Sequence, residues 1–90
     1  MTFVYILECA DGSYYTGWTT DLTQRVTAHN EGRGGRYTRS RRPVKLVYWE
    51  QHADRRSAQQ RELALKGMPR SRKLALIADF APGDLFQSSD

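Results

Sequence analysis

Two ionisable side chains stand where a helix would ordinarily bury apolar ones. In the segment DLTQRVTAHNEG, Leu22 and Val26 begin an apolar stripe at helical spacing, and His29 falls on or beside that stripe. Arg25 lies at its edge. A guanidinium can neutralise charge that builds up on a phosphoryl group, and an imidazole can hold or move a proton. The pair points to phosphate chemistry; the alternative is a solvated arginine beside an ordinary boundary histidine.

A carboxylate occupies a similar position in a second amphipathic segment. Glu62 follows Ala58 by four residues and precedes Leu65 by three, so it should face inward or lie at the core boundary. An unpaired buried carboxylate is costly. We therefore expect Glu62 either to pair with Arg61, Lys66 or a residue across the core, or to have a functional role. Surface placement is the remaining alternative.

Tyrosines in two β-prone segments complete a set that could hydrolyse phosphodiesters. Tyrosines in strands mostly pack, and Tyr5 and Tyr15 taken alone would be assigned to the core. Together with Arg25, His29 and Glu62 they allow more. One carboxylate with waters and substrate phosphate can hold a hard cation such as Mg²⁺. A tyrosine or histidine can orient or deprotonate the attacking water. The sequence has no phosphate-binding P-loop, dinucleotide-binding glycine motif or two-histidine metal motif.

The basic residues are concentrated in one stretch of a chain whose 90 residues fit a single domain. The net charge is +4, and eleven of the fourteen basic side chains are arginine. Residues 25–45 contain seven basic residues and one acid. Arginine matches the geometry of phosphate, and a basic segment attracts polyanions by releasing counterions. The stretch therefore predicts nucleic-acid binding, with a solvated basic loop as the alternative.

The single cysteine, Cys9, excludes an intramolecular disulfide and a cysteine-based zinc cluster. A lone thiol suits a reducing compartment, and we expect a cytoplasmic protein. No apolar run approaches the ~18 residues that a membrane span needs. We therefore expect no membrane association.

Hydrophobic periodicity divides the chain into six main elements. The expected order is β-β-α-β-α-α, with strands at 3–9, 14–18 and 44–51 and helices at 21–31, 53–67 and from 69 onward. This order predicts a small α+β domain over residues 1–81, with a three-stranded antiparallel sheet flanked by helices. Residues 82–90 are expected to form a flexible C-terminal tail.

Local signals set the expected boundaries of these elements. Thr20 is the expected N-cap of the first helix, and Gly32 its stop signal. Residues 32–43, rich in glycine and arginine, are expected to form a flexible loop. Asp54 should cap the next helix, and Pro69 should lie in the first turn of the last. The apolar stripe of that last helix is expected at Leu74, Ile77 and Ala78.

The layout resembles the GIY-YIG nuclease family, whose name records two tripeptides on neighbouring strands. Here the tripeptides are FVY at residues 3–5 and YTG at residues 15–17, with the two tyrosines ten residues apart. Arg25 stands eight residues after the second tripeptide, where the family has its catalytic arginine. His29 and Glu62 match the positions of the family's His or Tyr and of its metal-binding glutamate.

The resemblance implies a role for each matched residue. Glu62 would hold one Mg²⁺ or Mn²⁺, and Arg25 would stabilise the pentacovalent phosphorus. Tyr5 is the first candidate for general base or water positioner, with Tyr15 and then His29 as alternatives. The phenolate would need support from Arg25 or the metal, because a free tyrosine has a pKa near ~10.

The implied function is endonucleolytic hydrolysis of DNA, with single-stranded or branched forms as plausible preferences. The residues expected to contact the nucleic acid are Trp18, Arg33, Arg36, Tyr37, Thr38, Arg39, Arg41 and Arg42. Trp18, where some family members have a lysine, could instead be a core residue. We expect a monomer without a small-molecule cofactor; the pathway, DNA repair among others, stays open. The alternatives are a non-catalytic nucleic-acid-binding module of the same fold and a module that binds an acidic protein.

Overall fold

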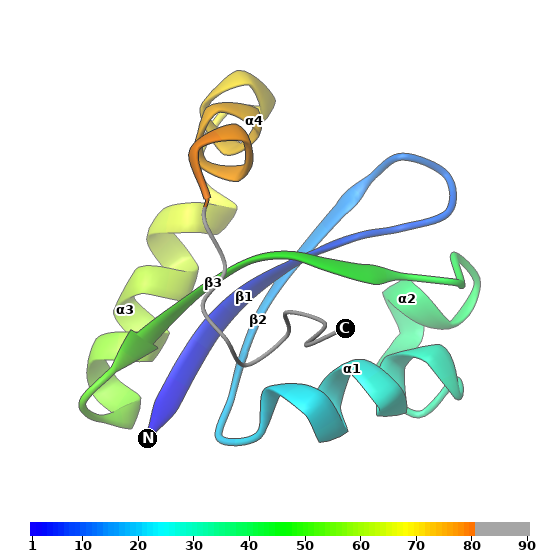
Figure 1. Cartoon of the computed structure of the whole chain (residues 1–90), viewed down its shortest axis with the longest axis horizontal. Helices are drawn as coiled ribbons and strands as arrows, with labels where there is room; N and C mark the ends of the chain where they lie inside the picture. The colour runs from blue at the N-terminus through cyan, green and yellow to red at the C-terminus, as the bar shows by residue number, and fades with distance from the viewer. Residues whose placement is uncertain (81–90) are drawn as a thin grey trace, which may run out of the picture.

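The computed structural model describes residues 1–80. They form a three-stranded antiparallel sheet with helices on both faces (Figure 1). The α+β class and the order β-β-α-β-α-α are confirmed, with one short additional helix. The tail predicted at 82–90, and the end of the predicted 1–81 domain, lie outside the described residues.

The sheet has the order β2-β1-β3, so β1 is central and β2 is an edge strand. The strands are β1 (Thr2–Glu8), β2 (Tyr14–Thr19) and β3 (Lys45–His52). The predicted boundaries agree with these within one residue. A register shift between Ile6 and Leu7 marks a bulge in the pairing of β1 with β3.

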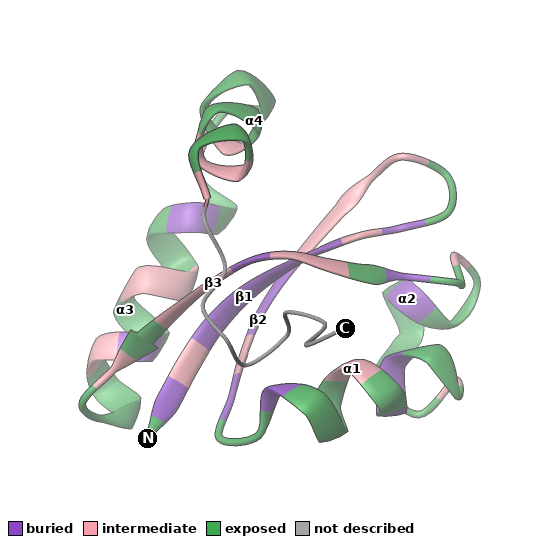
Figure 2. Ribbon diagram, in the orientation of Figure 1, coloured by how far each residue is buried: buried purple, intermediate pink, exposed green. Residues whose placement is uncertain are grey.

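β1 is buried along most of its length, as its nearly continuous apolar sequence predicts (Figure 2). Because successive side chains of a strand point to opposite faces, β1 contributes to two separate cores. Val4 and Ile6 pack with Tyr48, Ala58 and Leu65 on one face. The residues of the other core are Tyr5, Leu7, Cys9, Leu22 and Val44.

The first helix, α1 (Leu22–Asn30), begins one residue later than predicted. The expected N-cap, Thr20, is wrong: the cap is Asp21, whose carboxylate accepts a hydrogen bond of 3.0 Å from the Gln24 amide. A carboxylate satisfies the free amides of a helix start well, and the helix dipole favours its charge. Gly32 follows the helix with φ of 85°, which confirms the predicted stop signal.

The flexible loop predicted at 32–43 contains a short helix, α2 (Arg36–Arg39). Its preceding residue, Gly35, has φ of 146°, which glycine adopts readily. After Gly35 the segment RYTR has no further helix-breaking residue, and it closes one turn. The glycines therefore shape the entry to α2 instead of making the whole segment irregular.

The helix α3 (Arg55–Lys66) is capped by Asp54, as predicted, through a bond of 2.8 Å from the Ser57 amide. In α4 (Arg70–Asp79), Pro69 stands at the N-cap position just before the first turn. The predicted apolar stripe of α4 is partly wrong. Leu74 is 42 % exposed, whereas Leu76, Ile77 and Phe80 pack against the core.

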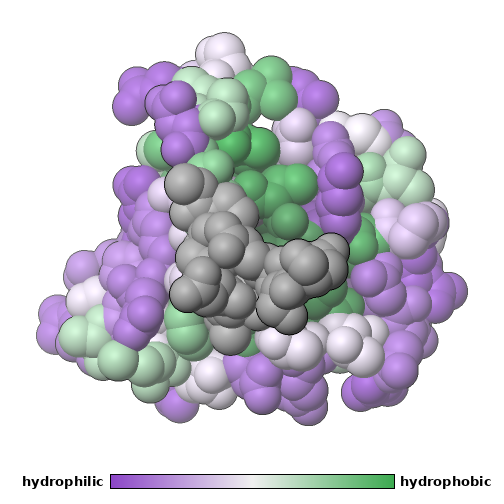
Figure 3. Space-filling view, viewed as in Figure 1, coloured by the Kyte–Doolittle hydropathy of each residue, from purple (hydrophilic) through white to green (hydrophobic). Residues whose placement is uncertain are grey.

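The outer surface is mostly polar. In Figure 3, hydrophilic side chains cover both flanks of the view, and apolar ones gather toward its middle. No helix within residues 1–80 combines the length and apolar character of a membrane span.

Candidate active site

A pocket of about 380 Å³ brings together residues from both sides of the sheet. Tyr5 and Tyr15 reach it from β1 and β2, Arg25 from α1 and Glu62 from α3. These are four of the five residues predicted to be catalytic. The fifth, His29, is fully buried and contacts the pocket through Tyr5.

Tyr5, His29 and Thr38 form a buried chain of hydrogen bonds. The Tyr5 hydroxyl lies 3.0 Å from Nε2 of His29, and Nδ1 of His29 lies 2.7 Å from Oγ1 of Thr38. Tyr5 is 1 % exposed, and the other two are 0 % exposed. Thr38 was predicted to line the nucleic-acid groove, but its side chain is inside the protein. It holds the imidazole instead, and α2 is the element that brings it there.

Burial shifts the pKa values of Tyr5 and His29 in opposite directions. Burial raises the pKa of Tyr5 well above its ordinary value, with a further rise from Tyr15, a lowering by Arg25 and a small rise from Glu62. Burial and then Arg25 lower the pKa of His29. Tyr5 is therefore a phenol at neutral pH, and His29 is a neutral imidazole that can accept a proton.

Two glycines make room for Tyr5 and His29. Gly17 pairs with Tyr5 in the sheet, and a Cβ on Gly17 would lie 2.6 Å from the Tyr5 hydroxyl oxygen. A Cβ on Gly34 would overlap the ring of His29 and would lie 2.6 Å from its Cα. Both positions require the absence of a side chain. The sequence-based analysis overlooked Gly34.

Glu62 lies at the pocket with 17 % of its side chain exposed. Its carboxylate pairs with Lys66 at 3.4 Å, one of the expected partners. Arg61 pairs instead with Glu50 on β3, with N–O distances of 2.9–3.0 Å. Among the lining residues that lie within 1–80, Glu62 is the one carboxylate.

The donor set of the pocket suits a hard divalent ion. Within residues 1–80 no group of three or more His, Cys, Asp and Glu residues could hold a metal. One carboxylate, with hydroxyl groups nearby, fits an ion such as Mg²⁺ that keeps several waters and binds substrate phosphate.

Arg55 is a pocket residue that the sequence-based analysis missed. It is the first residue of α3, and its Cζ lies 5.4 Å from the centroid of the Trp18 ring. Arg55 precedes Glu62 by seven residues, which is about two helical turns and places both on one face. That spacing could have identified it. Trp18 is half-buried, lines the pocket and packs against the core, so its contact with nucleic acid stays a prediction.

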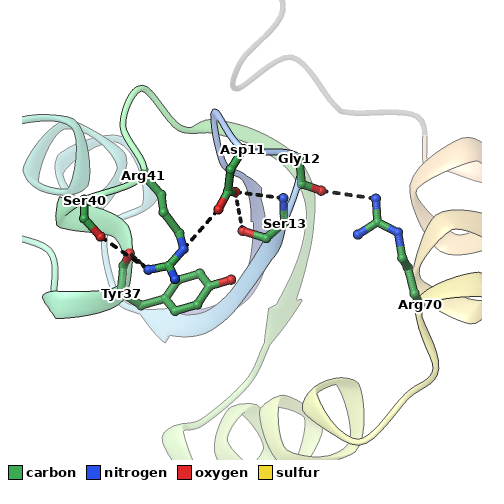
Figure 4. Close-up of polar contacts among 7 residues, drawn as sticks. All are labelled: Asp11, Gly12, Ser13, Tyr37, Ser40, Arg41 and Arg70. Atoms are coloured by element: carbon green, nitrogen blue, oxygen red, sulfur yellow. Dashed lines mark hydrogen bonds and ion pairs between the residues drawn. The ribbon is translucent and has the colours of Figure 1, made fainter.

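Three of the predicted nucleic-acid-binding arginines are engaged within the protein. Arg33 pairs with Glu31, and Arg42 donates to the carbonyl oxygens of Arg39 and Asn30. Arg41 contacts both the β1–β2 turn and α2, as described below (Figure 4).

The other surface residues of the predicted set are freer. Arg36 and Arg39 make no ion pair within the described part of the chain. Tyr37 is 38 % exposed and stacks on Tyr15, with ring centroids 6.0 Å apart and an interplanar angle of 25°. Tyr37 thus extends the aromatic lining of the pocket toward the surface.

Known proteins resemble this chain in sequence and in fold. A family profile described as the GIY-YIG catalytic domain matches residues 1–75. The chain is 54 % identical over 78 residues to UPF0213 protein CPE1444 of Clostridium perfringens, covering 87 % of this chain and 84 % of that one. It is 48 % identical over 77 residues to a UPF0213 protein of Staphylococcus aureus, covering 86 % of this chain and 94 % of the relative.

Two solution NMR structures have the same fold. UPF0213 protein BH0048 from Bacillus halodurans is 42 % identical with a TM-score of 0.56, covering 87 % of this chain and 84 % of that one. Protein EF2693 from E. faecalis is 37 % identical with a TM-score of 0.57, covering 84 % and 81 %. With a catalytic-domain match over most of its length and relatives of this similarity, the chain belongs to the GIY-YIG family.

Proposed function

We propose that this protein is a divalent-metal-dependent endonuclease that hydrolyses phosphodiester bonds in DNA. The main support is the convergence of Tyr5, Tyr15, Arg25 and Glu62 on one pocket, with Tyr5 bonded to the buried His29. These residues come from four different elements, and packing alone gives no reason for their polar groups to meet there.

In this proposal Tyr5 and His29 act together as the general base. With hydrogen on Nδ1 of His29 bonded to Thr38, Nε2 is free to accept the Tyr5 proton. Water attacks phosphorus as the bond to the leaving oxygen breaks. The water proton passes to the Tyr5 oxygen while the Tyr5 proton passes to Nε2, and the leaving oxygen takes a proton from solvent. A free phenolate, which burial disfavours, is never required.

The charged residues of the pocket have complementary roles. Arg25 binds the non-bridging oxygens, whose negative charge grows in the transition state. Arg55, over Trp18 on the far side of the pocket lining, binds an adjoining phosphate. Glu62 would hold a Mg²⁺ or Mn²⁺ ion, with Lys66 neutralising the carboxylate when the ion is absent. When bound, that ion polarises the phosphate and supports the leaving oxygen.

The proposed partner is DNA, and the chain acts on it as a monomer in the cytoplasm. A net charge of +4 favours a polyanion. All five residues of the proposed catalytic set come from one chain, so no second copy is needed to complete it. The unpaired Cys9 is buried, which is compatible with a reducing compartment.

A non-catalytic binding module is the second candidate. The ion pair between Glu62 and Lys66 favours it, because it gives the carboxylate a partner without a metal. Such a module would bind nucleic acid through the same surface and would not turn over.

The test compares the wild type with Glu62→Gln, and with Glu31→Gln as a control that changes an exposed carboxylate away from the pocket. Each protein is incubated with labelled single-stranded, duplex and branched DNA, in Mg²⁺, Mn²⁺ or EDTA. We expect metal-dependent cleavage that Glu62→Gln abolishes and Glu31→Gln retains, with DNA binding preserved in both. Binding without cleavage of any substrate by the wild type would establish the second candidate instead.

A further inference from the structure

A second hollow adjoins the proposed catalytic pocket along the edge strand β2. Its volume is about 230 Å³, and it is lined by Tyr14, Tyr15, Thr16, Tyr37, Lys66 and Lys73. Tyr15 belongs to both hollows. Lys66 links them as well, because it lines the second and pairs with Glu62 in the first. The two hollows are therefore neighbours that share the Tyr15 side chain.

The charge of the groove calls for an anion. Lys66 comes from the end of α3 and Lys73 from α4, so two basic residues from different helices line the groove. None of the lining residues from the described part of the chain is a carboxylate. Lys73 makes no ion pair within residues 1–80. Because Lys66 already pairs with Glu62, Lys73 is the lysine whose charge is left to attract an anionic ligand.

Tyr37 and Tyr14 line the groove, and each ring contacts an arginine that also binds the β1–β2 turn. Arg41 lies 3.9 Å from the Tyr37 ring centroid and donates to Oδ2 of Asp11 at 3.1 Å. Arg70 lies 4.8 Å from the Tyr14 ring centroid and donates to the carbonyl oxygen of Gly12 at 3.1 Å. Figure 4 shows both arginines reaching the same turn from opposite sides. The aromatic walls are therefore positioned before any ligand arrives.

The size of the groove selects the form of the ligand. Its volume of about 230 Å³ lies below the ~300–1,000 Å³ typical of small-molecule pockets. A groove of this size can receive one base or one sugar-phosphate unit of a strand. Aromatic lining beside basic residues is also what single-strand-binding grooves use, because tyrosine rings accept any base.

We propose that this groove binds the unpaired DNA strand immediately next to the bond that is cut. Lys73, with Lys66, contacts a phosphate, and the exposed part of Tyr37 supports the neighbouring base or sugar. This inference rests on the proposed function and deepens it, because it makes a single-stranded segment beside the cleavage position the substrate.

The first test measures binding in EDTA, where no cleavage occurs, by fluorescence anisotropy of a labelled single strand and the matching duplex. Lys73→Gln is compared with Lys45→Gln, which removes an exposed lysine outside the groove. We expect Lys73→Gln to weaken single-strand binding about fivefold at low salt and to lower the salt slope by about 0.7, the value for one phosphate contact. Duplex binding should change less, and Lys45→Gln should bind like the wild type.

A second pair of variants tests the aromatic wall. Tyr37→Leu removes the ring and Tyr37→Phe keeps it, and circular dichroism verifies that both fold. We expect Tyr37→Leu to weaken single-strand binding about tenfold, as loss of one stacking contact does, and Tyr37→Phe to change it little. Wild-type affinity in both Lys73→Gln and Tyr37→Leu, or equal losses for single strand and duplex, would overturn the inference.

These outcomes separate the inference from the proposed function. If the wild type cuts DNA and Glu62→Gln does not, while Lys73→Gln and Tyr37→Leu both bind every substrate like the wild type, only the groove assignment fails. If Glu62→Gln cuts as well as the wild type, the catalytic assignment fails, whatever the groove variants do in EDTA.

Discussion

At the scale of single residues, the unusual feature is a buried tyrosine, Tyr5, whose hydroxyl is hydrogen-bonded to a histidine that is itself buried, His29. A phenol in that position cannot ionise easily, since burial penalises its anion. The same burial keeps His29 uncharged. Burial therefore holds both groups in their neutral forms: Tyr5 as a phenol that carries a proton, and His29 as an imidazole with a ring nitrogen free to accept one. This pairing, more than either side chain alone, makes Tyr5 suited to activate water.

Arg55 allows a sharp test of the pocket because its neighbour in sequence serves as a control. Arg55 lines the pocket, whereas Arg56 is exposed and lies outside its lining. If Arg55 contacts substrate phosphate, Arg55→Gln should lower kcat/KM about tenfold to a hundredfold, the loss expected for a charged hydrogen bond. Arg55→Lys should recover part of that loss. Steady-state cleavage of a labelled oligonucleotide measures both.

Arg56→Gln removes the same charge one residue away and should leave kcat/KM within about twofold of the wild type, as surface ionic contacts contribute little. Equal losses in Arg55→Gln and Arg56→Gln would contradict a specific contact in the pocket. They would show that the net charge of the helix start matters instead.

At the scale of elements, the segment between α1 and β3 does more than carry charge. Gly34 passes so close to His29 that any side chain would overlap the imidazole. We expect Gly34→Ala to destabilise the fold by about 1–3 kcal/mol, the usual range for an overpacked interior, and to impair cleavage with it. Urea unfolding followed by circular dichroism gives the free energy of unfolding.

Gly67 provides the matched control for this substitution. A Cβ at Gly67 would meet only carbonyl oxygens at 3.7 and 3.8 Å, and its φ of −82° suits any residue. Gly67→Ala should therefore be neutral or stabilising by up to about 1 kcal/mol, since alanine restricts the unfolded chain. A Gly34→Ala variant as stable as Gly67→Ala would mean that the loop moves freely away from His29.

This segment also shows where prediction from sequence ends. Alternation, turn residues and the cap at Asp54 suffice to predict the three strands and α3, because those signals act between near neighbours. The contacts of Gly34 and Thr38 with His29 depend on a fold-back that no local pattern encodes. A run of glycine and arginine is typical of a flexible loop, so α2 and its buried threonine were missed.

The candidate site, like the fold, was predicted only in part from the sequence. Family spacing identified Tyr5, Tyr15, Arg25 and Glu62, which the structure brings to one pocket. Charge alone could not distinguish arginines that face solvent from those that bind within the protein. Arg41 looked like a phosphate contact, yet it links Asp11 with the backbone and ring of Tyr37. That difference follows from tertiary partners, which composition does not reveal.

At the scale of the whole molecule, the pocket depends on both faces of one thin sheet. Tyr5 belongs to the core beneath α1, whereas Glu62 belongs to α3, whose apolar residues pack in the core on the other face. The two meet at the edge strand β2, where Gly17 leaves room for the Tyr5 ring. The geometry of the pocket is thus only as stable as the attachment of α3 to the sheet.

One half-buried ion pair adds to the apolar packing that attaches α3 to the sheet, and it predicts how stability depends on pH. Glu50 on β3 accepts from Arg61 on α3 at 2.9–3.0 Å, and also from Tyr48 and His52. Burial would raise the pKa of Glu50, but these hydrogen bonds outweigh it and the pKa is lowered from 4.5. When folding lowers the pKa of a carboxyl, its charged form stabilises the fold at pH values above the unfolded-state pKa. That stabilisation is lost as the pH falls through the folded-state pKa.

We therefore expect Glu50→Gln to lower the free energy of unfolding by about 2 kcal/mol at pH 7, because it leaves Arg61 without its charged partner. The loss should shrink when unfolding is measured below the ordinary pKa of 4.5, where the wild-type carboxylate becomes protonated as well. Glu31→Gln, which breaks the exposed pair with Arg33, should cost less than about 1 kcal/mol at either pH. Because α3 carries Arg55 and Glu62, Glu50→Gln should also reduce cleavage at temperatures where the variant remains folded. A loss of stability in Glu50→Gln that does not change with pH would assign its effect to packing and not to charge.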